Sequence, residues 1–274
     1  MNLLRSALVV AGVTGVAVAA MLLVRRRAPA GSWFQDGDRA AGVFGVLATG
    51  FSVLLGFIIF LAFQAYDDTR AGAEGEAATV AQMVQTAQLM PAGSSQELTG
   101  ELICYGRSVV GTEWDAVASG KVEDSLNPWG AKMFTTVAAL QPKTPTEQSA
   151  YDRWMAQTAD RQTSRNARVH TAEGIIPTPL WLALYVICGV IFCFLLFFAD
   201  SAEGAWTQGV LMGSVAVVIS VLMLLLGFFD NPHGEGVGQL KPTAMERSLR
   251  IIDSQVAALG ITADPPCDAL GNAR

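Results

Sequence analysis

Residues 42–68 read GVFGVLATGFSVLLGFIIFLAFQAYDD, and this stretch decides the fold. No charged residue occurs in it before Asp67. A helix needs about 20 apolar residues to cross the hydrocarbon core of a membrane. The chain becomes polar at Gln64 without a proline, and helical spacing of apolar residues continues to Met90. We therefore predict one long helix from Gly42 to Met90, with its first half in the bilayer and its second half outside.

The composition supports a membrane protein. The chain has 274 residues, of which 51% are hydrophobic and 15% are charged, whereas soluble domains carry about 25% charged residues. Four windows that are nearly free of charge could each span a bilayer: residues 7–24, 40–65, 180–199 and 205–229. We predict an all-α fold, with four transmembrane helices and a helical-bundle extramembrane domain inserted between the second and third spans.

The predicted domains follow from these windows. They are residues 1–65, with the first two spans and a short basic loop; 66–178, the extramembrane helical domain; 179–229, the third and fourth spans; and 230–274, a turn-rich linker with a C-terminal amphipathic helix. The linker contains Gly-x-Gly-x-Gly at residues 234–238, but no strand is predicted before it and no helix begins from it, which argues against nucleotide binding.

Local signals predict several helix ends in the extramembrane domain. Ser94 and Glu97 have the spacing of a capping box, which places a helix start there. Asn127 precedes Pro128, a common arrangement at the first turn of a helix. Two glycines in the long second helix, at 72 and 75, weaken helical structure and predict a bend there.

The first span has two interpretations. Residues 1–19 could form a cleaved signal peptide, with Arg5 before the apolar run and small residues at 17–19. The apolar run continues to Arg25-Arg26-Arg27, however, which favours an uncleaved anchor. By the positive-inside rule this basic cluster lies in the cytoplasm of a bacterial cell, so the N-terminus, the helical domain and the C-terminal tail are expected outside the inner membrane. The loop at 200–208 has no Lys or Arg and gives no support.

Cys104 and Cys267 are the two cysteines outside the predicted spans. Four crossings place both on the same side of the membrane. If that side is oxidising, the two can form a disulfide. The alternative is a pair of unrelated thiols.

Small residues in two spans predict close helix packing. In the second span small residues recur every four residues in two series, Ala41, Gly45 and Thr49 and then Ala48, Ser52 and Gly56. In the fourth span Gly209 and Gly213 have the same spacing. For the fourth span we expect packing within the chain. For the second span, packing within the chain and packing against another copy both stay open.

The sequence carries no recognisable catalytic machinery. It has no His-Glu-x-x-His, Cys-x-x-Cys, Gly-x-Ser-x-Gly or Walker-type motif. We therefore expect no enzyme, no cofactor and no bound metal; His233 fits a polar loop better than a metal site with Asp230 and Glu235. The net charge of −6 argues against a nucleic-acid partner, which leaves the lipid bilayer and a homo-oligomer as expected partners.

The spans contain no charged residue, which argues against a proton relay, a voltage sensor or an ion-coupled transporter. A pore with an apolar constriction stays possible, and Phe51, Phe57 and Phe60 are its candidate lining. In an oligomer, acidic residues after the second span would form rings at the pore mouth that favour cations: Asp67, Asp68, Glu74 and Glu76. The alternative for these residues is a solvated helix face.

Several short motifs occur in a characteristic order. They are Tyr66-Asp67-Asp68, Glu74-x-Glu76-Ala77, Glu113-Trp114, Pro179-Leu180-Trp181 and Asp230-Asn231-Pro232. From about Arg25 to Leu249 the chain resembles a bestrophin-like family of bacterial multi-pass membrane proteins of uncharacterised function. The resemblance implies kinship to bestrophin anion channels, which are oligomers with an apolar neck. His233 departs from the family pattern, in which phenylalanine is expected after that proline.

Two functions follow as hypotheses. The first is a homo-oligomeric ion channel or pore lined by the second span. The second is a non-catalytic membrane scaffold or envelope sensor whose outer helical domain binds a protein partner.

Overall fold

The computed structural model describes residues 3–91, 93–121, 127–234, 236–261 and 263–274. The chain forms two compact units. Unit 1 comprises Met1–Ala65, Ile175–Asn231 and Glu235–Gln239, and unit 2 comprises Tyr66–Gly174, Pro232–Gly234 and Leu240–Arg274. One helix, α2 (Gly37–Ala87), contributes to both.

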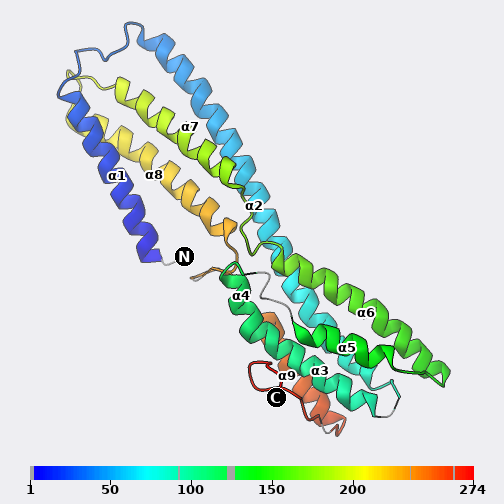
Figure 1. Ribbon diagram of the computed structural model, residues 1–274. Helices are drawn as coiled ribbons and strands as arrows, with labels where there is room; N and C mark the ends of the chain where they lie inside the picture. Colours follow the sequence, from blue (N-terminus) through cyan, green and yellow to red (C-terminus); the bar gives the residue numbers. More distant parts are fainter. Residues whose placement is uncertain (1–2, 92, 122–126, 235, 262) are drawn as a thin grey trace. The chain divides into compact units, whose positions relative to one another are not determined.

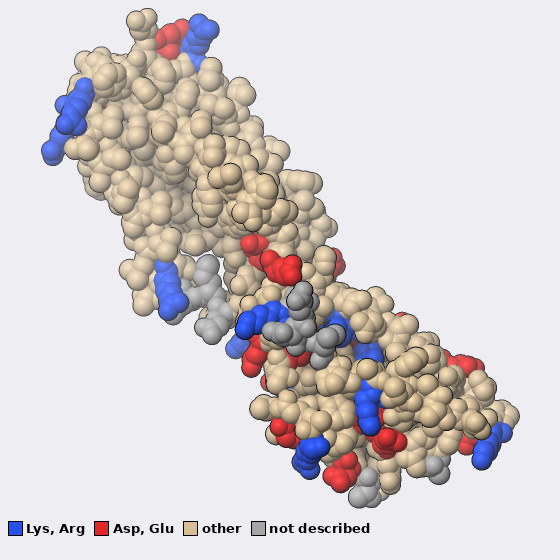
Figure 2. Space-filling model, in the orientation of Figure 1, with Lys and Arg blue, Asp and Glu red and all other residues tan. Residues whose placement is uncertain are grey.

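Unit 1 holds the membrane helices. They are α1 (Leu3–Arg25), the first part of α2, α7 (Thr178–Phe197) and α8 (Ala205–Asp230) (Figure 1). Within the described residues, these four helices are long and apolar enough to cross a membrane, which confirms the predicted number of spans. On the face shown in Figure 2, the long middle of unit 1 carries no basic or acidic side chain.

Glycines bring α8 and α1 close together. A Cβ atom added at Gly209 would lie 3.6 Å from Val18, and one added at Gly213 would lie 3.4 Å from Val18 and 3.7 Å from Thr14. Small side chains let helix backbones approach in a membrane, where contact area rather than water exclusion drives association. These two glycines therefore pack within the chain.

Asp230, at the end of α8, anchors the entry to α7. Its carboxylate accepts hydrogen bonds from the backbone N–H groups of Ile175 and Ile176, at 2.9 and 2.7 Å, and from Trp181 Nε1 at 3.1 Å. The Asp-Asn-Pro and Pro-Leu-Trp motifs of the sequence thus meet at one point of unit 1. At the other ends of the spans, Arg25 donates to the carbonyls of Ser201 and Glu203.

Unit 2 is a helical bundle that encloses its own apolar core. Its elements are the second part of α2, α3 (Ser94–Ser108), the π-helical turn η1 (Val109–Glu113), α4 (Trp114–Ala118), α5 (Pro128–Ala138), α6 (Pro145–Val169) and α9 (Thr243–Ala258) (Figure 1). The described residues of both units form no strand, only an isolated bridge between Cys267 and Ala273. The all-α prediction is confirmed.

Two helix starts were predicted in the extramembrane domain from capping residues. Asn127 caps α5 as predicted, because its side chain accepts a hydrogen bond from Trp129 N. The helix start predicted at Ser94 is confirmed, since α3 begins there, but the capping box is wrong, because the cap residue is Gly93, which has no side chain. The reciprocal pair occurs instead at α6, between Thr144 and Glu147. Ser94 is itself the first residue of the helix, one position too late to act as the cap, and its hydroxyl donates to the carbonyl of Pro91.

The helix α2 continues without a break through Gly72 and Gly75, where the bend was predicted. The two glycines serve a close approach to α6. A Cβ at Gly72 would lie 2.7 Å from the carbonyl oxygen of Ser164 and 2.8 Å from Ala167 Cβ. Such contacts leave no room for a side chain.

The C-terminal tail is tied to the bundle. Cys104 and Cys267 form a disulfide with an S–S length of 2.03 Å, across a sequence separation of 163. Trp129 Nε1 donates to the carbonyl of Gly271 at 2.6 Å, and Gly271 has a φ of 84°. A Cβ at Gly271 would lie 2.3 Å from Ser108 N, so both the backbone conformation and the space require glycine.

Candidate functional site

One side of α2 builds the core of unit 1. Phe51, Leu55, Ile58 and Ala62 recur every three or four residues and are at most 5% exposed. They pack against α7 and α8, on the buried side chains Leu184, Cys188, Ile191 and Leu226. Phe51 was a predicted pore-lining residue. That prediction is wrong, because its side chain faces the chain's own core.

The opposite side of α2 carries an exposed apolar stripe. Val46, Val53, Phe57 and Phe60 are 75%, 68%, 59% and 53% exposed. Their spacings of seven, four and three residues keep them on one helix face. We call these four residues the α2 stripe. Both remaining lining candidates, Phe57 and Phe60, lie on it.

The small-residue strip of α2 is also exposed. Gly45, Ser52 and Gly56 are exposed, and a Cβ added at Gly45 or Gly56 would meet nothing within 4 Å. Ser52 donates to the carbonyl of Ala48 at 2.8 Å. Ser52 and Gly56 border an apolar groove of about 350 Å³, whose other wall comes from α7 and α8. Unlike the glycines of α8, Gly45 and Gly56 are not in contact with another helix among the described residues.

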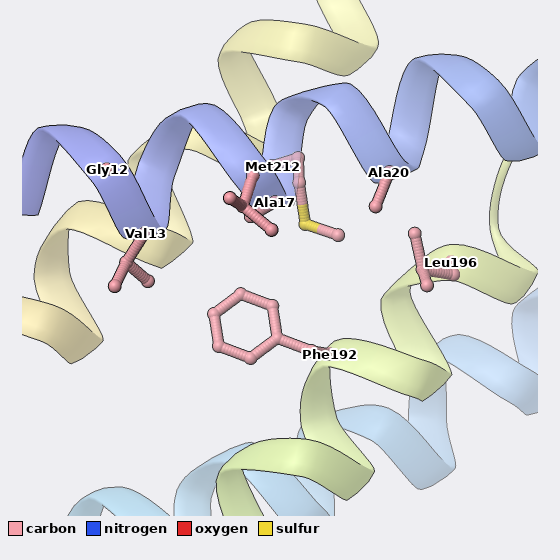
Figure 3. Close-up of a pocket in the computed structure, with 8 residues that line it drawn as sticks. Gly12, Val13, Ala17, Ala20, Phe192, Leu196 and Met212 are labelled. Atoms are coloured by element: carbon pink, nitrogen blue, oxygen red, sulfur yellow. The ribbon is translucent and has the colours of Figure 1, made fainter.

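A second apolar pocket lies between α1, α7 and α8. Its volume is about 450 Å³. Figure 3 shows Phe192 of α7 pointing into the space opposite α1, with Met212 of α8 beside Ala17 and Leu196 nearby. The described lining offers no charged or hydrogen-bonding side chain, so this pocket is apolar throughout.

The acidic residues that follow the span divide into two kinds. Asp67 and Asp68 are exposed, and Glu74 pairs with Arg70 at 3.1 Å while both side chains stay about 60% exposed. Glu76 is 0% exposed. The prediction that Glu76 faces a pore mouth is therefore wrong, whereas the other three carboxylates lie in solvent.

Glu76 belongs to a buried ion-pair cluster in unit 2. Arg168 Nε donates to Glu76 at 2.5 Å, and Arg168 also donates to Glu113 at 2.7 Å. Arg165 Nε donates to the same Glu113 oxygen at 2.9 Å, and the Tyr105 hydroxyl donates to Glu76. Burial opposes the charge on Arg168, but the two carboxylates outweigh it and raise the pKa of Arg168. The cluster links α2, η1 and α6 inside unit 2 through buried ion pairs.

The π-helical turn η1 positions Glu113 in this cluster. Gly111 has a non-helical φ of −97° and ψ of −105°, and a Cβ there would lie 3.3 Å from the carbonyl of Leu270. Hydrogen bonds in a π-helix span five residues, one more than in an α-helix. Asn127 Nδ2 donates to Glu113 Oε2 at 3.0 Å, so both carboxylate oxygens of Glu113 accept hydrogen bonds.

His233 is buried beside the cluster. It is 4% exposed, and its ring meets Trp114 edge-on with 5.2 Å between the ring centroids. In the described part of the chain, neither ring nitrogen has a hydrogen-bond partner. Burial and the nearby Arg168 charge lower the pKa of His233 to about 4. The described residues contain no group of three His, Cys, Asp or Glu side chains that could hold a metal ion, and Glu235 lies outside them.

Comparisons with known proteins identify the family and the fold of this chain. The model of the bestrophin-like domain matches residues 11–245. The chain belongs to the bestrophin-like family. None of the curated proteins matches it. Bestrophin-like structures are similar in fold at low identity: a bacterial bestrophin homologue from Klebsiella pneumoniae aligns at 12% identity with a TM-score of 0.70, over 90% of this chain and 98% of that one.

Other solved structures agree. A second variant of the Klebsiella pneumoniae bestrophin homologue gives a TM-score of 0.68 at 12% identity, over 89% of this chain and 98% of that one. A structure described as a membrane protein gives 0.68 at 12% identity, over 89% and 97%. The resemblance predicted from the sequence motifs is thereby confirmed, and so is the bestrophin-like fold.

Proposed function

We propose that this protein is a homo-oligomeric ion channel of the bacterial inner membrane, with a pore lined by the α2 stripe. The observation that carries the proposal is the exposure of Phe57 and Phe60 on the side of α2 that faces away from the chain's own core. Membership of the bestrophin-like family, with its implied kinship to oligomeric channels, supports it.

Exposure alone is weak support in a bilayer, because lipid also covers apolar faces. The small-residue strip adds a second argument. Gly45 and Gly56 flank the stripe and have no partner in the chain's described residues. A glycine that faces lipid adds no packing contact, whereas one that faces another helix allows close approach. If several copies were arranged around an axis, a neighbouring copy would lie against Gly45 and Gly56, and the α2 stripe would face the axis.

Single-channel recording tests the proposal. The purified protein is reconstituted into planar bilayers and compared with Phe57→Ala and Phe60→Ala. Because aromatic side chains narrow an apolar constriction, we expect discrete conductance that rises in both variants. Leu182→Ala is the matched control, since Leu182 is 65% exposed on α7 and is expected to leave conductance unchanged. Silence across ion types and voltages, with Phe57→Ala also silent, rejects the proposal.

Ion preference is a separate question. Asp67 and Asp68 lie about two helical turns after Phe60, the last residue of the stripe, and are exposed. Carboxylates near a pore mouth favour cations, so we expect a cation-selective reversal potential in asymmetric salt. The variant Asp67→Asn with Asp68→Asn should shift that potential toward zero. If the reversal potential indicates anion selectivity and is the same with and without the two substitutions, the cation preference is wrong, although the proposal that the protein is a channel still holds.

The orientation is also proposed. Unit 2 and the C-terminal tail lie outside the cytoplasm in this proposal, supported by the basic cluster at Arg25–Arg27 and by the Cys104–Cys267 disulfide, which needs an oxidising compartment. Ser119 is exposed in unit 2. A membrane-impermeant maleimide should label Ser119→Cys in cells whose inner membrane is intact. Labelling only after lysis reverses the orientation.

A second candidate function is a membrane scaffold or envelope sensor. It is favoured by unit 2, which has its own core and a disulfide-tied tail and so could present a stable surface to a partner. Crosslinking in native membranes separates the two functions. A reproducible second protein on unit 2 favours the scaffold, and contacts between identical chains through α2 favour the channel.

A further inference from the structure

Arg161 is a buried cation that the ion-pair cluster does not use. It lies on α6 seven residues after Trp154 and seven before Arg168. Two helical turns return a side chain to nearly the same face, and all three side chains are at most 3% exposed. The helix face that buries Trp154 therefore also carries Arg161 into unit 2.

Among the described residues, no carboxylate forms an ion pair with Arg161. Glu76 and Glu113 form their ion pairs with Arg168 and Arg165. Arg161 is a third guanidinium. None of the ion pairs formed by described residues includes it, and its Nε is buried without a hydrogen-bond acceptor. A buried charge normally requires both a counter-charge and hydrogen bonds.

The structure supplies only part of that compensation. The guanidinium of Arg161 lies over the Tyr105 ring, 4.5 Å from its centroid. An aromatic face attracts a cation but accepts none of its in-plane N–H groups. The edge of the guanidinium, where a carboxylate would bind through two hydrogen bonds, is thus left for another group.

A pocket begins at this guanidinium. Its volume is about 490 Å³, and its described lining includes two arginines but no Asp or Glu. Thr158 and Gln162 add polar groups, whereas Phe134 and Met155 add apolar surface at an exposed rim. The pocket therefore combines a guanidinium that has no ion pair among the described residues with hydrogen-bonding and apolar walls.

The first turn of α5 strengthens the positive field. Asn127, Gly130 and Ala131 line the pocket at the N-terminus of this 11-residue helix, whose first turn has no acidic residue. The N-terminal end of a helix carries a partial positive charge. Arg161 NH1 lies only 3.4 Å from where a Cβ on Gly130 would sit, so the guanidinium lies directly against this turn.

We propose that this pocket binds a small organic carboxylate, with its carboxylate on Arg161 and its apolar body against Phe134 and Met155. One unmatched guanidinium suits a single negative charge, and a planar carboxylate matches the fork of N–H donors. The volume is that of a site for a small molecule rather than for a bare ion. The site lies entirely in unit 2 and does not depend on ion conduction.

The test uses 4-fluorobenzoate as the probe and ¹⁹F NMR as the measurement, on the full-length protein in detergent micelles. We expect saturable broadening of the probe signal at millimolar concentration, and none with the neutral 4-fluorobenzamide. Arg161→Gln should weaken binding at least tenfold, because it removes the charge-assisted pair. Arg153→Gln, an exposed position on the same helix, should leave binding unchanged.

A second variant guards against a folding defect. Ala159→Trp changes an exposed residue of the pocket lining and should block the probe while Arg161 stays intact. Circular dichroism checks the helix content of each variant. The proposal is overturned if 4-fluorobenzoate fails to bind the wild type, if Arg161→Gln binds it equally well, or if the benzamide broadens to the same extent.

Discussion

The packing of α2 on α6 can be tested with two glycines of the same helix. Gly72→Ala and Gly75→Ala each add one methyl group to α2. The gain in helix propensity is the same for both, about 1 kcal/mol. The two differ in what the methyl group meets, so the pair isolates the effect of the close approach.

At Gly72 the added Cβ would lie 2.7 Å from the Ser164 carbonyl oxygen and 2.8 Å from the Arg168 backbone nitrogen. Backbone atoms cannot rotate away, so the helices must separate. Overpacking of this kind costs about 1–3 kcal/mol, which exceeds the propensity gain over most of that range. At Gly75 the nearest atom, at 2.9 Å, is the hydroxyl of Ser164, which can rotate. We expect a net loss of up to about 2 kcal/mol for Gly72→Ala and, for Gly75→Ala, no loss.

Thermal unfolding in detergent, followed by circular dichroism, measures the difference. At about 2–4 °C per kcal/mol, Gly72→Ala should melt several degrees below Gly75→Ala. The effect should also reach Arg168, which neighbours the contact and holds the ion-pair cluster. If Gly72→Ala melts at or above the temperature of Gly75→Ala, α2 and α6 do not approach as closely as described, and the reasoning fails.

Three further predictions concern unit 2. Glu113→Gln removes a buried carboxylate shared by two arginines and should destabilise unit 2 by about 3–5 kcal/mol in denaturant titrations, against at most about 1 for the exposed Glu74→Gln. Cys104→Ser with Cys267→Ser should cost about 2–5 kcal/mol, and dithiothreitol should lower the melting temperature only of the wild type. Burial lowers the pKa of His233 to about 4 in the folded protein, against 6.5 in the unfolded chain. As the pH falls from 6.5 to 4, the unfolded chain therefore binds a proton at His233 that the folded protein does not, and the folded state loses stability. Relative to His233→Phe, the wild type should therefore lose up to about 3 kcal/mol between these pH values, and equal pH profiles would contradict this.

The membrane helices were predictable because a span is a local property. An uncharged run of sufficient length identifies it wherever its partners lie. The cap at Asn127 was predictable for the same reason, since it needs only its own two following residues. Ser94 shows the limit of such signals: the spacing to Glu97 predicted the helix start, but Gly93 and not Ser94 takes the cap position.

The candidate site depended on which helix face is buried, and that is set by distant residues. Glu74 and Glu76 are two positions apart, yet one is in solvent and the other is enclosed with Arg168, 92 residues away. A signal did exist: Glu76 lies four residues before Val80 on the apolar face of α2, where a charge needs a partner. The spacing of seven from Trp154 to Arg161 was a similar signal on α6.

The glycines illustrate why a motif of small residues identifies a contact but not its partner. Gly213 faces α1, Gly72 faces α6, and Gly56 faces nothing in the chain's described residues. In the first two cases the partner helix is supplied by the same chain, and the glycine is explained. For Gly56 the same physics requires either lipid, which does not select glycine, or a helix from another copy. An unpartnered glycine can also be incidental, as Gly12 of α1 shows. What distinguishes Gly56 is its place beside the α2 stripe, where one association between copies would cover the glycine and enclose Phe57 and Phe60 together.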